Sequence, residues 1–275
     1  MLTALLFGLF GLIVGSFLNV LIIRHGVRSL GGRSACMTCG RQLTWTDMIP
    51  VVSWIMLSGK CRRCFARISI QYPLVEAMTA VLFALIGGAP SFDILYKALL
   101  CIIGAILIAI AVYDLRHTII PDAWAYTFSA LTLFVMGPLF LLDPSVSFIL
   151  YVCSGPIAAL PLFLLWLVSG GRWMGLGDAK LALGIGWLLG PTLGITAIFA
   201  AFVVGALISV CILLPLPRIL RWLHTHGITF MENAGGGFTM TSEIPFGPFL
   251  VFSCITLWLS LLYGIDPTLG LGLLL

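Results

Sequence analysis

Two acidic residues stand beside long apolar stretches, where a charged side chain needs a function or a partner. Asp178 lies in the motif Gly175-Leu-Gly-Asp-Ala-Lys180, and an uncharged run follows directly. Asp114 stands at the end of an earlier apolar run. Two carboxylates that share a site do not both ionise easily, so one can serve as general acid and the other as general base. Asp114 and Asp178 are therefore the candidate catalytic pair.

A second group able to do chemistry consists of four of the eight cysteines, Cys36, Cys39, Cys61 and Cys64. Two C-x-x-C pairs at this spacing are typical of a four-thiolate zinc site. Gly40 and Gly59 suit tight turns beside the two pairs. A redox dithiol and plain free thiols are the alternatives. Because so small a segment builds little apolar core, zinc would supply much of its folding energy.

The composition indicates the kind of protein that must position these groups. The chain is 61% hydrophobic and only 9% charged, whereas about a quarter of the residues in soluble domains are charged. The sequence therefore predicts an all-α polytopic membrane protein. Its uncharged runs predict about eight transmembrane helices, near 2–23, 73–90, 95–113, 119–141, 146–169, 178–190, 192–216 and 245–264. The sixth run is short, and only Gly190-Pro191 separates it from the seventh, so the two can also be one bent segment.

The orientation follows from the positions of lysine and arginine, which are enriched in cytoplasmic loops. An N-terminus outside the cytoplasm leaves only Lys97, of 14 basic residues, on the outer side. The 24–72 segment is then cytoplasmic, and an even number of spans places both termini in the periplasm. Asp114 and Asp178 both fall at the inner ends of their spans, facing the cytoplasm. The basic residues assigned to the inner side are Arg24, Arg28, Arg33, Arg41, Lys60, Arg62, Arg63, Arg67, Arg116, Arg172, Lys180, Arg218 and Arg221.

Other acids collect at the same level of the membrane: Glu76, Asp122 and Glu243. They stand at the N-terminal ends of spans, where the helix dipole favours a carboxylate. Capping or structural pairing explains them, and holding a basic substrate is the alternative. Asp114 differs, because the dipole disfavours an anion at the C-terminal end of a helix.

Two other classes of function fit part of the pattern. A proton-coupled membrane transporter would use Asp114 and Asp178 as relay carboxylates, but such residues are expected nearer the bilayer midplane and in repeated halves. A non-catalytic scaffold would use the cysteine segment for docking, but it leaves both aspartates without a role.

An ordered set of motifs resembles the bacterial type IV prepilin peptidases, also called leader peptidase/N-methyltransferases, a family of GxGD-type membrane aspartic proteases. The resemblance covers nearly the whole chain. Its motifs are Gly15-Ser-Phe-Leu-Asn-Val20, the paired C-x-x-C, Ile49-Pro50, Tyr72-Pro-Leu-Val-Glu76, Asp114 with Ile120-Pro-Asp122, Gly175-Leu-Gly-Asp-Ala-Lys180 and Ile244-Pro-Phe-Gly-Pro-Phe249.

This resemblance implies a function and a site. The family's catalytic aspartates fall on Asp114 and Asp178, with Gly175, Gly177 and Lys180 as supporting positions. It implies cleavage of the short basic leader from prepilins and pseudopilins of type IV pili or type II secretion, at the cytoplasmic face of the inner membrane. It also implies N-methylation of the new N-terminus with S-adenosylmethionine as donor, and zinc in the four-cysteine segment.

We therefore expect a first transmembrane helix at 1–23, a cytoplasmic zinc-binding segment at 24–72 and a membrane-embedded aspartic peptidase domain at 73–275. The expected partners are precursor proteins and membrane lipid. Nucleic acid is not expected, because the basic segment is tethered to a bilayer.

Overall fold

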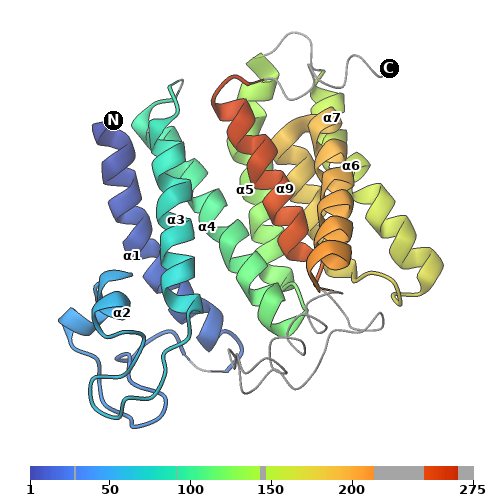
Figure 1. The fold of residues 1–275 in the computed structure, drawn as a ribbon. Coiled ribbons are helices and arrows are strands. Elements are labelled where there is room, and N and C mark those ends of the chain that lie inside the picture. The colour runs from blue at the N-terminus through green and yellow to red at the C-terminus, as the bar shows by residue number, and fades with distance from the viewer. Residues whose placement is uncertain (28, 91, 143–146, 214–244, 266–275) are drawn as a thin grey trace. The chain divides into compact units, whose positions relative to one another are not determined.

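A computed structural model of the 275-residue chain describes residues 1–27, 29–90, 92–142, 147–213 and 245–265. Within these ranges the secondary structure is helical, apart from two isolated bridges that pair Ala35 with Gln42 and Lys60 with Arg67. The elements in Figure 1 are α1 (Leu2–Arg24), η1 (Trp45–Met48), α2 (Val52–Met56), α3 (Gln71–Gly88), α4 (Ile94–His117), α5 (Asp122–Leu142), α6 (Phe148–Ser169), α7 (Leu176–Ile208), η2 (Ser209–Leu213) and α9 (Gly247–Leu262).

Five helices among the described residues are long and apolar enough to cross a membrane. They are α1, α3, α4, α6 and the helix that begins at Leu176. The chain is therefore an all-helical, multi-pass membrane protein. Helices α5 and α9 lie at two further positions where apolar runs predicted spans. The total of eight spans stays a prediction.

Helix α7 answers the question of whether the sixth and seventh apolar runs form one segment. Gly190 has a non-helical backbone with φ of 81°. A Cβ built on Gly194 would lie 3.0 Å from the Cα of Gly186. In a straight helix eight residues rise about 12 Å, so the chain must turn back on itself at Gly190-Pro191. The two runs are thus two helical halves that lie against each other.

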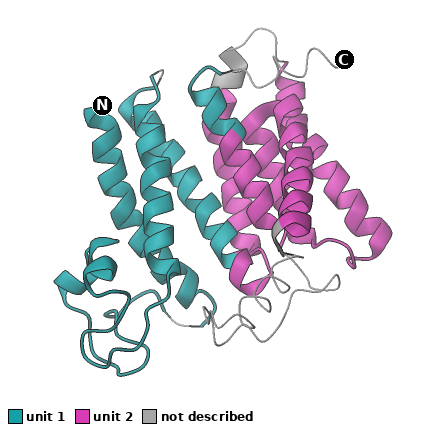
Figure 2. Cartoon of the chain, in the orientation of Figure 1, with its two compact units in different colours: residues 1–113, 257–275 teal, residues 114–256 magenta. Residues whose placement is uncertain are grey.

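The chain divides into two compact units, shown in Figure 2. The first contains residues 1–113 and 257–275, and the second contains residues 114–256. In the first unit α1 packs closely on α3, because a Cβ on Gly11 would lie 2.8 Å from the Cα of Ala80. Small residues of this kind allow membrane helices to approach at the backbone.

The second unit is built around α7. Gly184 packs against Phe128 of α5, and Gly186 packs against the backbone of Ser154 in α6. Ser154 Oγ also donates a hydrogen bond to the Gly186 carbonyl oxygen, at 3.0 Å. These contacts hold the N-terminal half of α7, which carries Asp178, between α5 and α6.

Candidate functional site

Asp114 lies in the last turn of α4, within the second unit, and is only 4% exposed. The helix ends three residues later, and the N–H of Thr118 donates to the Asp114 carbonyl oxygen at 2.7 Å. The carboxylate itself accepts a hydrogen bond from the backbone N–H of Gly247, with 3.0 Å between nitrogen and Oδ2. A buried carboxylate that the dipole of its own helix disfavours is therefore held by a donor from a different helix.

Gly247 is the first residue of α9, so the positive end of this helix faces Asp114. A Cβ at this position would lie 2.6 Å from Oδ2 of Asp114. Only glycine allows the backbone N–H to come this close to the carboxylate without displacing it. Helix α9 thus fixes the position of Asp114 through a residue that has no side chain.

Asp178 is the third residue of α7 and is 8% exposed. Its backbone N–H donates to the Gly175 carbonyl oxygen at 3.3 Å, and its carboxylate receives a backbone hydrogen bond from Gly175. The negative charge of Asp114 is close enough to the Asp178 carboxylate to interact with it electrostatically. The structure therefore brings the two sequence-predicted aspartates together inside one unit.

Ile120 contacts both Gly177, next to Asp178, and Gly247, which donates to Asp114. A Cβ on Gly177 would lie 3.0 Å from the Cβ of Ile120, and one on Gly247 would lie 3.3 Å from its Cδ1. Ile120 is 6% exposed. The segment between α4 and α5 therefore packs against the N-termini of both α7 and α9, which fixes the spacing between the helix end that carries Asp178 and the helix end that donates to Asp114.

Lys180, the fifth residue of α7, and Asp122, the first residue of α5, form an ion pair at 2.7 Å. The Lys180 ammonium also lies 5.5 Å from the ring centroid of Tyr126. The Asp122 side chain is 63% exposed, so the pair contributes at most about 1 kcal/mol to stability. Two of the predicted supporting residues thus pair with each other beside the aspartates.

Glu76 belongs to the first unit and is buried in α3. Its Oε2 accepts a hydrogen bond from the N–H of Val51 at 2.7 Å. In this position it connects α3 to the cysteine-containing segment, rather than capping its own helix. Glu243 lies outside the described residues.

The four cysteines predicted to bind zinc come together in the first unit. Their sulfur atoms all lie within 4.8 Å of one another, and those of Cys36 and Cys64 are 3.8 Å apart. A tetrahedral zinc with Zn–S bonds of 2.3 Å requires sulfur atoms about 3.8 Å apart. The donor set and its geometry therefore fit a structural zinc ion.

The two C-x-x-C pairs form turns of the same geometry. The N–H of Gly40 donates to the carbonyl of Cys36 at 2.9 Å, and the N–H of Phe65 donates to that of Cys61 at 3.0 Å. Backbone N–H groups of Cys39 and Thr38 also bond to the Cys36 sulfur and lower its pKa to about 6. Such donors stabilise a thiolate, the form that binds metal.

The residue that follows the second cysteine pair, as Gly40 follows the first, is Phe65. Gly40 has φ of 69° and Phe65 has φ of 57°. The expected Gly59 also has positive φ, but a Cβ there would lie 2.8 Å from the ring of Trp54. Gly59 therefore makes room for a tryptophan, while Phe65 carries the strain of the turn.

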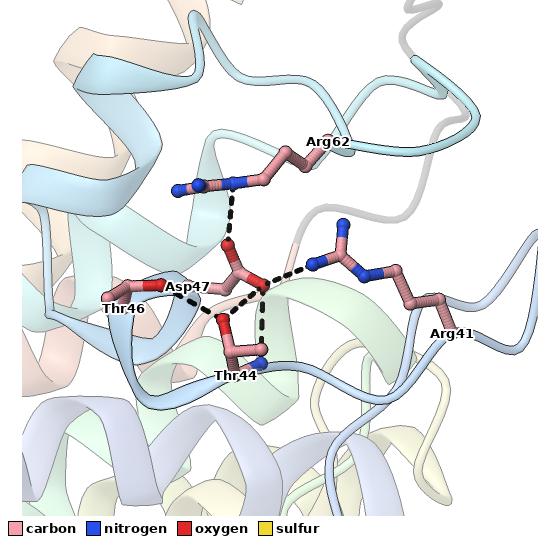
Figure 3. Close-up of polar contacts among 5 residues, drawn as sticks. All are labelled: Arg41, Thr44, Thr46, Asp47 and Arg62. Carbon is pink, nitrogen blue, oxygen red and sulfur yellow. Dashed lines mark hydrogen bonds and ion pairs between the residues drawn. The ribbon is translucent and has the colours of Figure 1, made fainter.

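Asp47 joins the two cysteine turns, a role that the sequence did not reveal (Figure 3). Its carboxylate pairs with Arg62, inside the second turn, at 3.1 Å and with Arg41, just after the first turn, at 3.4 Å. It also accepts hydrogen bonds from the N–H and Oγ1 of Thr44. Burial raises the pKa of Asp47, but the Thr44 hydrogen bonds and the two arginines outweigh it, so the pKa lies below its usual range.

Comparison with known families identifies two matching regions. Residues 9–88 match the Bacterial Peptidase A24 N-terminal domain, and residues 101–210 match the Type IV leader peptidase family. The first region contains the four-cysteine cluster, and the second contains Asp114 and Asp178. No solved structure gives a significant match.

Full-length relatives show the same assignment. Proteins described as prepilin leader peptidase/N-methyltransferase are 30% identical in Dichelobacter nodosus, 32% in Aeromonas hydrophila and 31% in Pseudomonas aeruginosa. These matches cover 93–94% of this chain and 89–90% of the relatives. The chain therefore belongs to the type IV leader peptidase family and is a peptidase.

Proposed function

We propose that the chain removes the short basic leader from type IV prepilins and pseudopilins at the cytoplasmic face of the inner membrane. The observation that carries this proposal is the pair of buried carboxylates, Asp114 and Asp178, at the ends of helices in one unit. Membership of the type IV leader peptidase family supplies the reaction class. The names of the full-length relatives supply the class of substrate.

In the proposed mechanism the two aspartates share one proton. The ionised carboxylate takes a proton from water, and the water oxygen attacks the scissile carbonyl carbon. The protonated carboxyl donates its proton to the carbonyl oxygen. When the tetrahedral intermediate collapses, the C–N bond breaks and the leaving amine receives a proton from the dyad. Gly247 and Gly175 keep the two carboxylates in position through their backbone N–H groups.

The same proposal assigns roles to the remaining parts. The 24–72 segment binds one structural zinc ion through Cys36, Cys39, Cys61 and Cys64. The first helix (1–23) and the 73–275 domain are embedded in the membrane and together contain eight spans. Both termini face the periplasm. Six further residues have a role in substrate binding or in structural support: Glu76, Asp122, Gly175, Gly177, Lys180 and Glu243.

We further propose that the chain N-methylates the new N-terminal residue, with S-adenosylmethionine as donor. The description of the relatives as leader peptidase/N-methyltransferases supports this activity. The amine that cleavage has released attacks the donor's methyl carbon in its neutral form, the carbon–sulfur bond breaks, and the demethylated donor leaves as a neutral thioether.

The test uses detergent-purified, zinc-loaded protein and a prepilin of defined sequence, with Asp114→Asn and Asp178→Asn run beside the natural chain. Product masses are read with and without S-adenosylmethionine. We expect loss of the leader only with both aspartates present, and a further gain of one methyl only with the donor. Normal cleavage by either folded variant would refute the dyad. An intact precursor with the natural chain, repeated for several prepilins, would favour the transporter alternative instead.

A further inference from the structure

The short helix α2 presents an apolar face that the described residues of its unit leave uncovered. Val52, Ile55 and Met56 are 47%, 63% and 77% exposed. Their spacing of three and four residues places them on one face of the helix. On another face, the ring of Trp54 packs against Gly59, and its Nε1 donates to the Ile68 carbonyl oxygen at 3.2 Å. The helix is therefore attached to the cysteine segment by Trp54 and turns its other apolar side chains outward.

The start of α2 is tied to two of the helices that are long and apolar enough to cross a membrane, α1 and α3. Val51, which precedes it, donates its N–H to Glu76 of α3 at 2.7 Å. Glu76 in turn lies against α1, since a Cβ on Gly15 would be 2.7 Å from the Glu76 Cα. With a rise of 1.5 Å per residue, Glu76 lies about 7 Å from the start of α3 at Gln71, and Gly15 lies about 13 Å from the end of α1 at Arg24. Figure 1 shows α2 beside this end of α1 and α3.

The charge of the segment points to the same environment. Between residues 24 and 72 the chain has eight lysine and arginine residues and one acid, Asp47. The Asp47 side chain is only 4% exposed and is paired with two arginines. Lys60, Arg63 and Arg67 are exposed. The surface of this segment therefore offers positive charge without a competing exposed carboxylate in its described part.

We propose that α2 is an interfacial anchor whose face, formed by Val52, Ile55 and Met56, inserts among the lipid acyl chains while the basic residues of the same segment bind anionic headgroups. Amphipathic elements with this combination of apolar and basic side chains lie about 5–10 Å into the headgroup and acyl boundary, and Glu76 ties α2 close to the end of α3 where that boundary is expected. Precursor leaders are themselves basic and would be repelled by this surface. A nucleic acid would use the positive charge but not the apolar face.

This inference requires only that α1 and α3 span a membrane, so it stands independently of the proposed substrate. The test places a diazirine amino acid at Ile55 in the full chain, reconstituted in vesicles of phosphatidylcholine with or without phosphatidylglycerol. Met37, an apolar residue of the first cysteine turn that is 74% exposed, carries the probe in the control. Zinc content is measured in both variants to confirm that the segment is folded.

After illumination we expect phospholipid adducts on the peptide that contains residue 55 and water adducts on the peptide that contains residue 37. Because each basic residue near an anionic surface strengthens binding about fivefold, the lipid adducts at residue 55 should increase by at least this factor with phosphatidylglycerol. Water adducts at residue 55, or equal lipid labelling at both positions, would overturn the proposal. Adducts with an added precursor protein in place of lipid would assign the face to the substrate and would overturn it too.

Discussion

Replacing Gly247 by alanine tests whether α9 positions Asp114 for catalysis. The added Cβ would lie 2.6 Å from Oδ2 and 3.2 Å from Cγ of Asp114. To restore a normal contact the carboxylate must retreat by roughly 0.5 to 1 Å, which breaks the 3.0 Å hydrogen bond from the Gly247 N–H. A hydrogen bond to a charged group is worth about 1.5–3 kcal/mol, which corresponds to roughly 10- to 200-fold in rate. A displacement of about 1 Å at a reacting group is expected to cost about 100-fold.

We therefore expect Gly247→Ala to lower kcat for leader cleavage by about 10- to 200-fold, with KM changed by less than about threefold, because the effect falls on the reacting group. The assay measures both constants on a purified prepilin, together with thermal unfolding and zinc content. Gly137→Ala in α5 is the matched control, since its Cβ would meet Tyr151 at an ordinary 3.5 Å. Full activity of Gly247→Ala would refute the assigned role, and an equal loss in Gly137→Ala would attribute the effect to general disturbance of the bundle.

Three further variants test other contacts. Asp47→Asn should speed zinc release to a chelator about tenfold, because it weakens charged hydrogen bonds worth about 1.5 kcal/mol or more. Since the pKa of Asp47 in the folded protein lies below its usual range, its contribution to zinc retention is complete above about pH 4 and is lost only as the pH falls through that folded pKa. The ratio of the zinc release rate of Asp47→Asn to that of the natural chain should therefore stay constant from about pH 8 to 5. A ratio that falls to one near pH 6 would contradict this. Phe65→Gly should stabilise the zinc-loaded protein by about 1 kcal/mol in thermal unfolding, because φ is 57° and the side chain is 71% exposed; a loss of stability would show that the ring is needed. Asp122→Asn should change the free energy of unfolding by less than about 1 kcal/mol, because the ion pair with Lys180 is exposed. It should raise KM for a precursor with a basic leader more than it lowers kcat. An unchanged KM would place leader recognition elsewhere.

The helices and the two clusters could be predicted because their signals are strong and local. Long uncharged runs place α1, α3, α4 and α6 within a few residues of the expected bounds, since a membrane helix must be apolar over most of its length. The cysteine cluster follows from spacing alone, because two C-x-x-C turns have few other uses. The proximity of Asp114 and Asp178 follows from charge counting, which places both at the same end of their spans.

The partners of these groups could not be predicted, because they depend on contacts between distant parts of the chain. Gly247 is 133 residues from Asp114 in sequence, and a backbone N–H leaves no pattern of side chains. One signal was available: an anion at the C-terminal end of a helix needs a donor from another element. Pro245-Phe-Gly-Pro248, just before the last apolar run, offers a helix start without a bulky side chain. Asp47 gave no such signal, because an isolated acid in a polar segment is usually solvated.

The reversal at Gly190 bears on how deep the site lies in the membrane. The half of α7 before the turn, residues 176–189, is about 21 Å long, whereas the hydrocarbon core is about 30 Å thick. If the turn lies at the far surface, the N-terminus of this half lies about 9 Å below the near surface, and Asp178, two residues further along, lies about 12 Å below it. A carboxylate at that depth needs burial within the protein and a hydrogen-bond donor, and Asp178 is buried and receives a backbone hydrogen bond from Gly175. Under the proposed function, we expect this depth to match the level at which the apolar helix of a precursor meets its polar leader, where the cut is made.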